Sequence, residues 1–199
     1  MAIQAVVFDA YGTLFDVYSI GALAERLYPG QGATISTLWR DKQIEYTRLI
    51  SLSDAHEEAL MAQYAQLKAF PENHGVLQTL RERGMTTAIL SNGNPEMLAS
   101  AVQSAGMADL LDHLISVDGV RQFKTMPVAY GEVARHIVAE RADVLFVSSN
   151  AWDVLGATWF GFTTLWINRQ SLPFETIGRR PDHTGSDLCA VLDVLGPVA

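Results

Sequence analysis

The sequence predicts an α/β fold: a doubly wound parallel sheet with helices on both faces and a small helical cap domain inserted near the N-terminus. Three observations support this prediction. Apolar runs rich in β-branched residues recur along the chain, amphipathic segments with helical spacing separate them, and this alternation is absent over residues 16–70. Strands that alternate with helices form a parallel sheet whose two faces are both covered.

Five apolar runs are predicted to be buried strands, and they span residues 3–8, 86–90, 114–117, 144–147 and 164–167. The clearest helix is predicted over residues 95–105. Asn94 precedes it as a cap, Pro95 occupies its first position and Gly106 follows it as a stop signal. The order of these elements is the one expected for a parallel sheet.

Between residues 16 and 70 the pattern is helical, and no strand is predicted there. We expect one helix near residues 19–27, a longer one over residues 34–52, and a third that starts at Asp54, with Glu57 three residues later. The inserted segment leaves the sheet beside Asp9 and returns near Pro71, so it should cover the C-terminal edge of the sheet.

The predicted domains are therefore a core, made of residues 1–15 and 71–199, and a cap, made of residues 16–70. We expect Asp16, at the junction, to be a hinge or capping residue. The chain has a single cysteine, Cys189, which excludes an internal disulfide and a cysteine-rich zinc site. We expect Cys189 to fill the core near the C-terminus.

Composition restricts the class of protein. The 199 residues are 49% hydrophobic and 18% charged, and each apolar stretch is too short to cross a bilayer. No basic segment precedes the first apolar run, so we expect no signal peptide and a cytoplasmic location. The net charge of −8 argues against nucleic acid as a partner. It also means that an anionic substrate must meet positive charge placed locally.

Polar side chains follow the predicted strands at the points where the strands end. In a doubly wound sheet, ligands bind at the carboxyl ends of the strands. Four strand ends should therefore bring two carboxylates, one ammonium and several hydroxyl and amide groups to one edge of the sheet. These residues are Asp9, Tyr11, Gly12, Thr13, Ser91, Asn92, Lys124, Ser148, Ser149, Asn150, Trp152 and Asp153.

Several segments resemble one known family. The run from Val7 to Asp16 resembles the first motif of the haloacid dehalogenase superfamily, whose fold is a Rossmann-like sheet with an inserted cap. Residues 90–95 and 146–153 resemble the metal-independent L-2-haloacid dehalogenases of that superfamily, as do residues 39–43 and the spacing from Lys124 to Tyr130. The resemblance covers almost the whole chain. It implies the hydrolysis of short 2-haloalkanoic acids to 2-hydroxy acids, with inversion.

The residues and the resemblance together suggest roles for the site. Asp9 is expected to be the nucleophile that forms an ester with the substrate. Arg40, with Asn92, is expected to stabilise the departing halide, and Ser91 to bind the substrate carboxylate. Asp153 is the candidate general base. Lys124 is expected to keep Asp9 ionised, and Ser148 and Asn150 to orient the base. The resemblance marks Thr13 and Tyr130 as catalytic. Tyr11 and Trp152 are expected to form the pocket wall or to pack in the core.

Tyr11 indicates which branch of the superfamily this chain resembles. Phosphatases of the superfamily have a second aspartate two residues after the nucleophile, and this chain has Tyr11 there. Magnesium prefers several hard oxygen ligands, and this edge offers few carboxylates. We therefore expect a site without a metal or an organic cofactor.

Two other functions remain open at this stage. One is a phosphatase of the same superfamily. The other is a non-catalytic relative whose cap binds another protein, because the chain between Leu52 and Phe70 is shorter than the usual family pattern. A reduced cap could also slow the reaction, change the substrate size, or require a partner subunit to close the site. A homodimer is the expected assembly.

Overall fold

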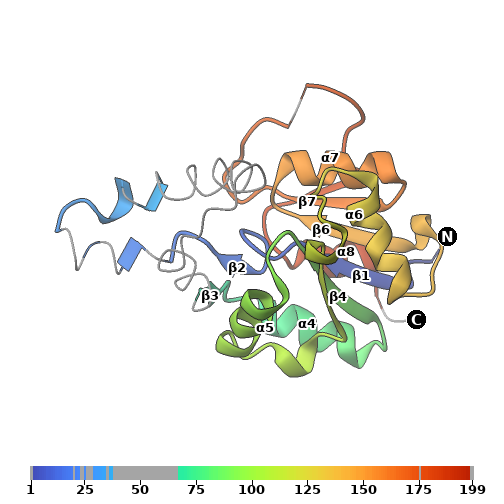
Figure 1. Cartoon of the computed structure of the whole chain (residues 1–199), viewed down its shortest axis with the longest axis horizontal. Helices are drawn as coiled ribbons and strands as arrows, with labels where there is room; N and C mark the ends of the chain where they lie inside the picture. Colours follow the sequence, from blue (N-terminus) through green and yellow to red (C-terminus); the bar gives the residue numbers. More distant parts are fainter. Residues whose placement is uncertain are drawn as a thin grey trace.

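The computed structural model describes residues 2–19, 21–22, 25, 29–34, 36–37, 67–174 and 176–197. Its main sheet has six parallel strands in the order β5-β4-β1-β6-β7-β8 (Figure 1). The strands are β1 Ala5–Phe8, β4 Thr86–Ser91, β5 His113–Ser116, β6 Val144–Ser148, β7 Thr163–Ile167 and β8 His183–Gly185. The predicted parallel sheet is therefore confirmed.

Helices cover both faces of this sheet (Figure 1). Along β1, Val6 and Phe8 face one core cluster, while Ala5 and Val7 face the other. The first cluster receives side chains from α4 Asn73–Glu82, α5 Pro95–Ser104 and α8 Ala190–Leu195. The second receives them from α6 Pro127–Gly131 and α7 Ala151–Phe160. Short 3₁₀ helices complete the connections: η2 Ala108–Leu110, η3 Asp118–Val120, η4 Glu132–Arg135 and η5 Arg141–Asp143.

The ends of α5 match the sequence signals. The side chain of Asn94 accepts a hydrogen bond from the Met97 backbone N–H at 2.8 Å, and Pro95 occupies the first turn. Gly106 follows the helix with φ of 67°, a left-handed conformation that glycine adopts without steric cost. The predicted helix over residues 95–105 is confirmed to within one residue.

A two-stranded antiparallel ribbon joins the core to the inserted segment. Its strands are β2 Phe15–Asp16 and β3 Lys68–Ala69, with Phe15 opposite Ala69. The prediction that residues 16–70 contain no strand was wrong here, because each strand has only two residues and shows no alternation. Asp16 does act as a turn residue: its carboxylate accepts a hydrogen bond from the Tyr18 backbone N–H at 2.9 Å.

Two further expectations need correction. Strand β8 was not predicted, because His183–Gly185 is short, largely exposed and polar. Cys189 does not fill the core: it is exposed at the residue before α8. In the inserted segment, the described residues Gly21, Ala22 and Glu25 are helical, whereas most of the predicted helix over residues 34–52 and all of the one from Asp54 lie outside the described residues.

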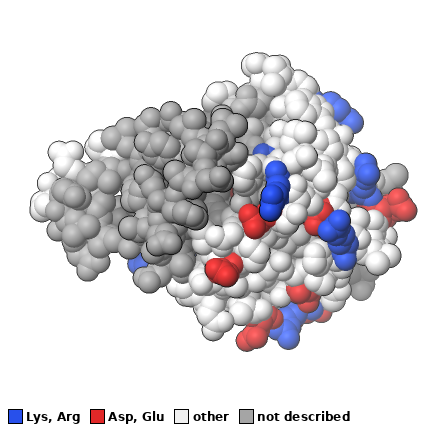
Figure 2. Space-filling view, in the orientation of Figure 1, with Lys and Arg blue, Asp and Glu red and all other residues white. Residues whose placement is uncertain are grey.

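No helix in the described part of the chain is long and apolar enough to cross a membrane. On the face shown in Figure 2, the Lys and Arg side chains lie among Asp and Glu side chains instead of forming one continuous patch. The whole chain has a net charge of −8, so this face offers little to attract a polyanion.

Candidate active site

Three neighbouring strands end at the same edge of the sheet. The central strand β1 lies between β4 and β6, and all three run parallel. Asp9 follows β1 directly, whereas Ser91 and Ser148 are the last residues of β4 and β6. The register of the pairs thus places the nucleophile candidate between two strand ends that carry polar side chains, at the edge where such folds bind ligands.

The carboxylate of Asp9 is almost buried, with 6% of the residue exposed. Its Oδ1 accepts a hydrogen bond from Lys124 Nζ at 2.8 Å. Its Oδ2 accepts two, from Thr13 Oγ1 at 3.0 Å and from Asn150 Nδ2 at 2.9 Å. A carboxylate has about four acceptor positions. Among the described residues, Oδ1 therefore retains the one position that can attack an electrophile.

Lys124 is the cation of the site. Its Nζ donates to Asp9 Oδ1 and Asp153 Oδ2, both at 2.8 Å, and to the backbone oxygen of Leu90 at 3.0 Å. All three N–H bonds are thus used although the side chain is only 1% exposed. Desolvation by burial acts to lower the pKa of Lys124, but the charges of Asp153 and Asp9 outweigh it and raise that pKa. The ammonium therefore stays charged.

Asp153, in the first turn of α7, has no exposed surface. Its Oδ2 contacts Lys124, and its Oδ1 accepts a hydrogen bond from the Tyr130 hydroxyl at 2.9 Å. Desolvation by burial raises the pKa of this carboxyl group to about 6, against the opposing charge of Lys124. Burial, together with the charge of Asp153, also raises the pKa of Tyr130, which remains a neutral donor.

The turn after β1 places Thr13 against the carboxylate of Asp9. Gly12 has φ of 97°, and the backbone N–H of Leu14 reaches back to the oxygen of Ala10 at 2.9 Å. Thr13 is fully buried, and its Oγ1 accepts a hydrogen bond from the Ser149 backbone N–H at 2.8 Å while donating to Asp9. A glycine at the turn and a fixed hydroxyl thus hold one side of the carboxylate.

Ser91 and Tyr11 lie together on the opposite side. Ser91 is 1% exposed, and its Oγ accepts a hydrogen bond from the Gly93 backbone N–H at 3.0 Å. A Cβ atom on Gly93 would lie 3.1 Å from the Tyr11 ring and 3.4 Å from Ser91 Oγ. The Tyr11 ring packs on Phe15, with ring centroids 5.7 Å apart. Tyr11 therefore lies beside Ser91, where a pocket wall is expected.

Of the other four predicted residues, the structure describes three. Ser148 Oγ accepts from the Asn150 backbone N–H at 3.1 Å, and Asn92 Oδ1 accepts from the Lys124 backbone N–H at 3.0 Å, so both support a neighbour of Asp9. Trp152 is half-buried in the first turn of α7. Arg40 lies outside the described residues.

Sequence reasoning missed one residue that the site requires. A Cβ atom on Gly156, in the middle of α7, would overlap the Tyr130 hydroxyl and lie 3.0 Å from Thr125. Glycine weakens a helix interior by roughly 1 kcal/mol relative to alanine. The absence of a side chain at Gly156 leaves the space in which the Tyr130 hydroxyl reaches Asp153. In the sequence, this position could have been recognised as a glycine inside an apolar helical pattern.

The site's own charges bear on metal binding. Lys124 Nζ already lies 2.8 Å from both carboxylates, in the place where a divalent cation would bridge them. In the described residues no group of three or more His, Cys, Asp or Glu side chains is arranged to hold a metal ion. The donor set of this site therefore fits an ammonium better than magnesium.

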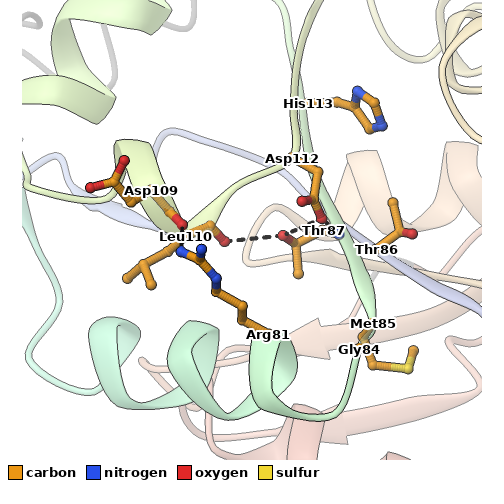
Figure 3. A pocket seen from close by; sticks show the side chains of 9 residues that line it. All are labelled: Arg81, Gly84, Met85, Thr86, Thr87, Asp109, Leu110, Asp112 and His113. Atoms are coloured by element: carbon orange, nitrogen blue, oxygen red, sulfur yellow. Dashed lines mark hydrogen bonds between the residues drawn. The ribbon is translucent and has the colours of Figure 1, made fainter.

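A separate surface cavity of about 560 Å³ lies at the other edge of the sheet (Figure 3). Its polar groups are engaged in fixing the segment before β5 to α4 and β4: Thr87 Oγ1 donates to the backbone oxygen of Leu110, Asp112 accepts from the Thr87 backbone N–H, and Arg81 donates to the backbone oxygen of Asp109. The cavity sits at the N-terminal ends of these strands, so it is not part of the Asp9 site.

Comparison with known proteins gives a consistent result. The family model for haloacid dehalogenase-like hydrolases matches residues 3–161. Haloacetate dehalogenase H-2 of Moraxella sp. (strain B) is 42% identical, and the alignment covers 97% of this chain and 98% of that protein. This alignment runs over 221 positions, more than the 199 residues of this chain. That relative therefore contains residues with no counterpart here.

Two solved structures are similar over nearly their full length. An L-2-haloacid dehalogenase is 48% identical with a TM-score of 0.88, covering 98% of this chain and 99% of the other. The L-2-haloacid dehalogenase of Xanthobacter autotrophicus with chloropropionic acid covalently bound is 35% identical, with a TM-score of 0.84 and coverage of 95% and 96%. Both the recognised family and the fold class predicted from the sequence are confirmed.

Replacement of Gly156 by alanine should destabilise the protein by displacing a side chain of the site. The new methyl group displaces Tyr130 and breaks its hydrogen bond to Asp153. We expect a loss of roughly 1–3 kcal/mol of unfolding free energy, the usual cost of overpacking a core. Thermal or urea unfolding measures this loss.

Gly75→Ala is the matched control. Gly75 is also helical, and a Cβ atom there meets nothing within 4 Å. This variant should be as stable as the wild type or slightly more stable. Equal stability of the two variants would contradict the proposed requirement for space beside Tyr130.

Proposed function

Because the chain belongs to the haloacid dehalogenase-like hydrolase family, we propose that it hydrolyses short 2-haloalkanoic acids to 2-hydroxy acids through an ester on Asp9. The observation that carries this proposal is the state of Asp9. Its carboxylate is buried, held by Lys124, Thr13 and Asn150, and keeps one acceptor position on Oδ1. Such a group is a fixed and desolvated nucleophile.

In the first half of the reaction, Asp9 Oδ1 attacks C2 of the substrate from the side opposite the halogen. The new C–O bond forms as the carbon–halogen bond breaks, and the halide leaves with the bonding electron pair. The ammonium group of Lys124 lies 2.8 Å from Asp9 Oδ1 and holds this oxygen in place for the attack. Configuration at C2 inverts once, so an L-2-halo acid gives a D-2-hydroxy acid.

Two anions must be bound during this step. We assign the substrate carboxylate to the region of Ser91, where Tyr11 forms a wall, and the halide to Asn92 and Arg40. Asn92 Oδ1 accepts a hydrogen bond from the Lys124 backbone N–H. The N–H₂ group of the same side chain can therefore serve as the donor to the halide. An anionic substrate approaching a protein of net charge −8 needs such local donors.

In the second half, water attacks the carbonyl carbon of the Asp9 ester, and its proton passes to the Lys124–Asp153 pair. Asp153 accepts hydrogen bonds from Lys124 and Tyr130, and Lys124 links it to Asp9. Protons of strongly coupled groups belong to the pair rather than to one member. Cleavage of the ester bond restores the Asp9 carboxylate, and the hydroxy acid leaves with the oxygen that came from Asp9. Ser148 Oγ accepts from the Asn150 backbone N–H, and the backbone oxygen of Asn150 accepts from the Asp153 backbone N–H, so both residues fix the start of α7, from which Asp153 projects.

The phosphatase alternative is disfavoured by the site. Tyr11 occupies the position of the second aspartate, and Lys124 occupies the position between the two carboxylates. A phosphoryl group would bring further negative charge with no magnesium site among the described residues to offset it.

Assembly and location complete the proposal. We propose a homodimer in the cytoplasm that acts on a small 2-haloacid, releases halide and uses neither a metal nor an organic cofactor. We also propose that residues 16–70 form the cap, and that its reduced length favours small substrates such as haloacetates.

Halide release is the first measurement. Purified protein should release chloride from L-2-chloropropionate and chloroacetate in the presence of EDTA, and Asp9→Asn should abolish this release because an amide is not a nucleophile here. Asp112→Asn is the control: Asp112 accepts a backbone hydrogen bond at the opposite edge of the sheet, and its replacement should preserve the release. A folded wild-type protein that releases no halide would contradict the proposed function.

Isotope labelling tests the ester. In a single turnover in water bearing ¹⁸O, the label should enter the Asp9 carboxylate and not the hydroxy acid, because water attacks the enzyme ester rather than C2. Mass spectrometry of the peptide around Asp9 reads the label. Label found directly in the product would instead show that water displaces the halide itself.

The pH dependence tests the second half. Because the pKa of Asp153 is raised to about 6, the pair is ready to accept a proton above that pH, and kcat should fall as the pH drops through about 6. The Tyr130 hydrogen bond acts to lower this pKa. Tyr130→Phe should therefore move the acid limb to higher pH. A limb that stays in place in this variant would assign the titration to another group.

A further inference from the structure

Arg169, just after β7, contacts three parts of the chain at the entrance to the inserted segment. Its Nη1 pairs with Glu72 at 2.6 Å, its guanidinium lies 3.7 Å from the centroid of the Phe70 ring, and its Nη2 donates to the backbone oxygen of Thr13 at 3.4 Å. The side chain is 19% exposed, so solvent screens these contacts only partly. No role was predicted for this residue from the sequence.

These contacts lie where the chain leaves the core and where it returns. The outgoing connection is Thr13–Leu14, before β2, and the returning one is Phe70, after β3. They are already linked, because the Phe70 backbone N–H and Asn73 Nδ2 both donate to the oxygen of Leu14, at 3.3 and 2.5 Å. Arg169 ties this junction to the end of β7, two strands away from β1.

The outgoing connection also carries a residue of the site. Thr13 offers its backbone oxygen to Arg169 and its hydroxyl to Asp9 Oδ2. A displacement of the Thr13 backbone therefore moves a donor that is 3.0 Å from the nucleophile. Displacements of this kind are costly in catalysis, since productive geometry tolerates little error.

We propose that Arg169 is a positioning residue for the dehalogenation, which fixes both connections of the inserted segment and, through Thr13, aligns Asp9 for attack. The inference rests on the proposed function. It assigns to Arg169 no contact with the substrate or with the reacting atoms.

Arginine is suited to this task and lysine is not. A guanidinium is planar and delocalised, so it can stack on Phe70 while its edge pairs with Glu72 and donates to Thr13. An ammonium is a point charge on a flexible stem and cannot satisfy all three. Glu72 is itself held to the core, because its Oε1 also accepts from the Leu188 backbone N–H at 3.4 Å.

The first test compares Arg169→Met and Arg169→Lys with Arg141→Met. Arg141 is a matched control: it lies 4.1 Å from the Phe160 ring centroid and donates to a backbone oxygen, but at η5, away from Asp9. We expect kcat for halide release to fall roughly tenfold or more in both Arg169 variants, with KM changed by less than about threefold. Arg141→Met should keep the wild-type kcat. Unchanged kcat in a folded Arg169→Lys protein would overturn the inference.

A double-mutant cycle tests the route through Thr13. If Arg169 acts by placing the Thr13 hydroxyl, then Arg169→Met should lower kcat by less than about twofold in a Thr13→Val background. Multiplicative effects of the two substitutions would show that Arg169 acts elsewhere, and would contradict the proposal.

Hydrogen exchange separates this inference from the proposed function. If the wild-type protein releases no halide, the proposed function fails, but exchange at the Phe70 amide can still be measured by NMR. This amide donates across the junction to Leu14. It should exchange roughly tenfold faster in Arg169→Met and at the wild-type rate in Arg141→Met. Equal protection of the Phe70 amide in all three proteins would refute the proposal that Arg169 fixes both connections, whatever the catalytic result.

Discussion

The structure of the site depends on one buried ammonium between two buried carboxylates. Lys124 Nζ lies 2.8 Å from both Asp9 and Asp153, and each of these three side chains is less than one-tenth exposed. Removing one member of a buried ion pair typically costs 3–5 kcal/mol, because it leaves an uncompensated charge in the interior. Charge as well as packing therefore holds together the end of β1, the start of α7 and the loop after η3.

The same triad sets the charge changes of the proposed reaction. With Asp9 and Asp153 ionised and Lys124 protonated, the triad carries a net charge of −1. Formation of the ester neutralises Asp9, so the remaining Lys124–Asp153 pair is electrically balanced while the halide departs. The substrate carboxylate must consequently be bound by donors outside the triad, which is why the Ser91 and Asn92 end of β4 is assigned to substrate and halide. Asp9 regains its charge only when the ester is hydrolysed.

Local sequence patterns predicted the parts of the fold that local physics decides. The five strands and helix α5 were recognisable because burial on both faces gives apolar runs and because caps have characteristic residues. Asp9, Thr13, Lys124, Tyr130, Asn150 and Asp153 are brought together as the sequence indicated. The ribbon of β2 and β3 and the role of Gly156 depend on residues distant in sequence, and Arg169 depends on three such contacts. No local period reports contacts of that kind.

The energetics of the triad also bear on whether the chain is an enzyme or a binding protein that has lost its chemistry. Burying three charges does not in itself stabilise a fold, since well-packed apolar side chains of similar volume serve as well or better. The structure nevertheless keeps Lys124 fully satisfied, admits Tyr130 to Asp153 through a helical glycine that weakens α7, and leaves one acceptor position on Asp9. A surface that only bound another protein would gain nothing from these features. Each of them is what a carboxylate nucleophile requires, because an attacking oxygen must be ionised, immobile and free on one side.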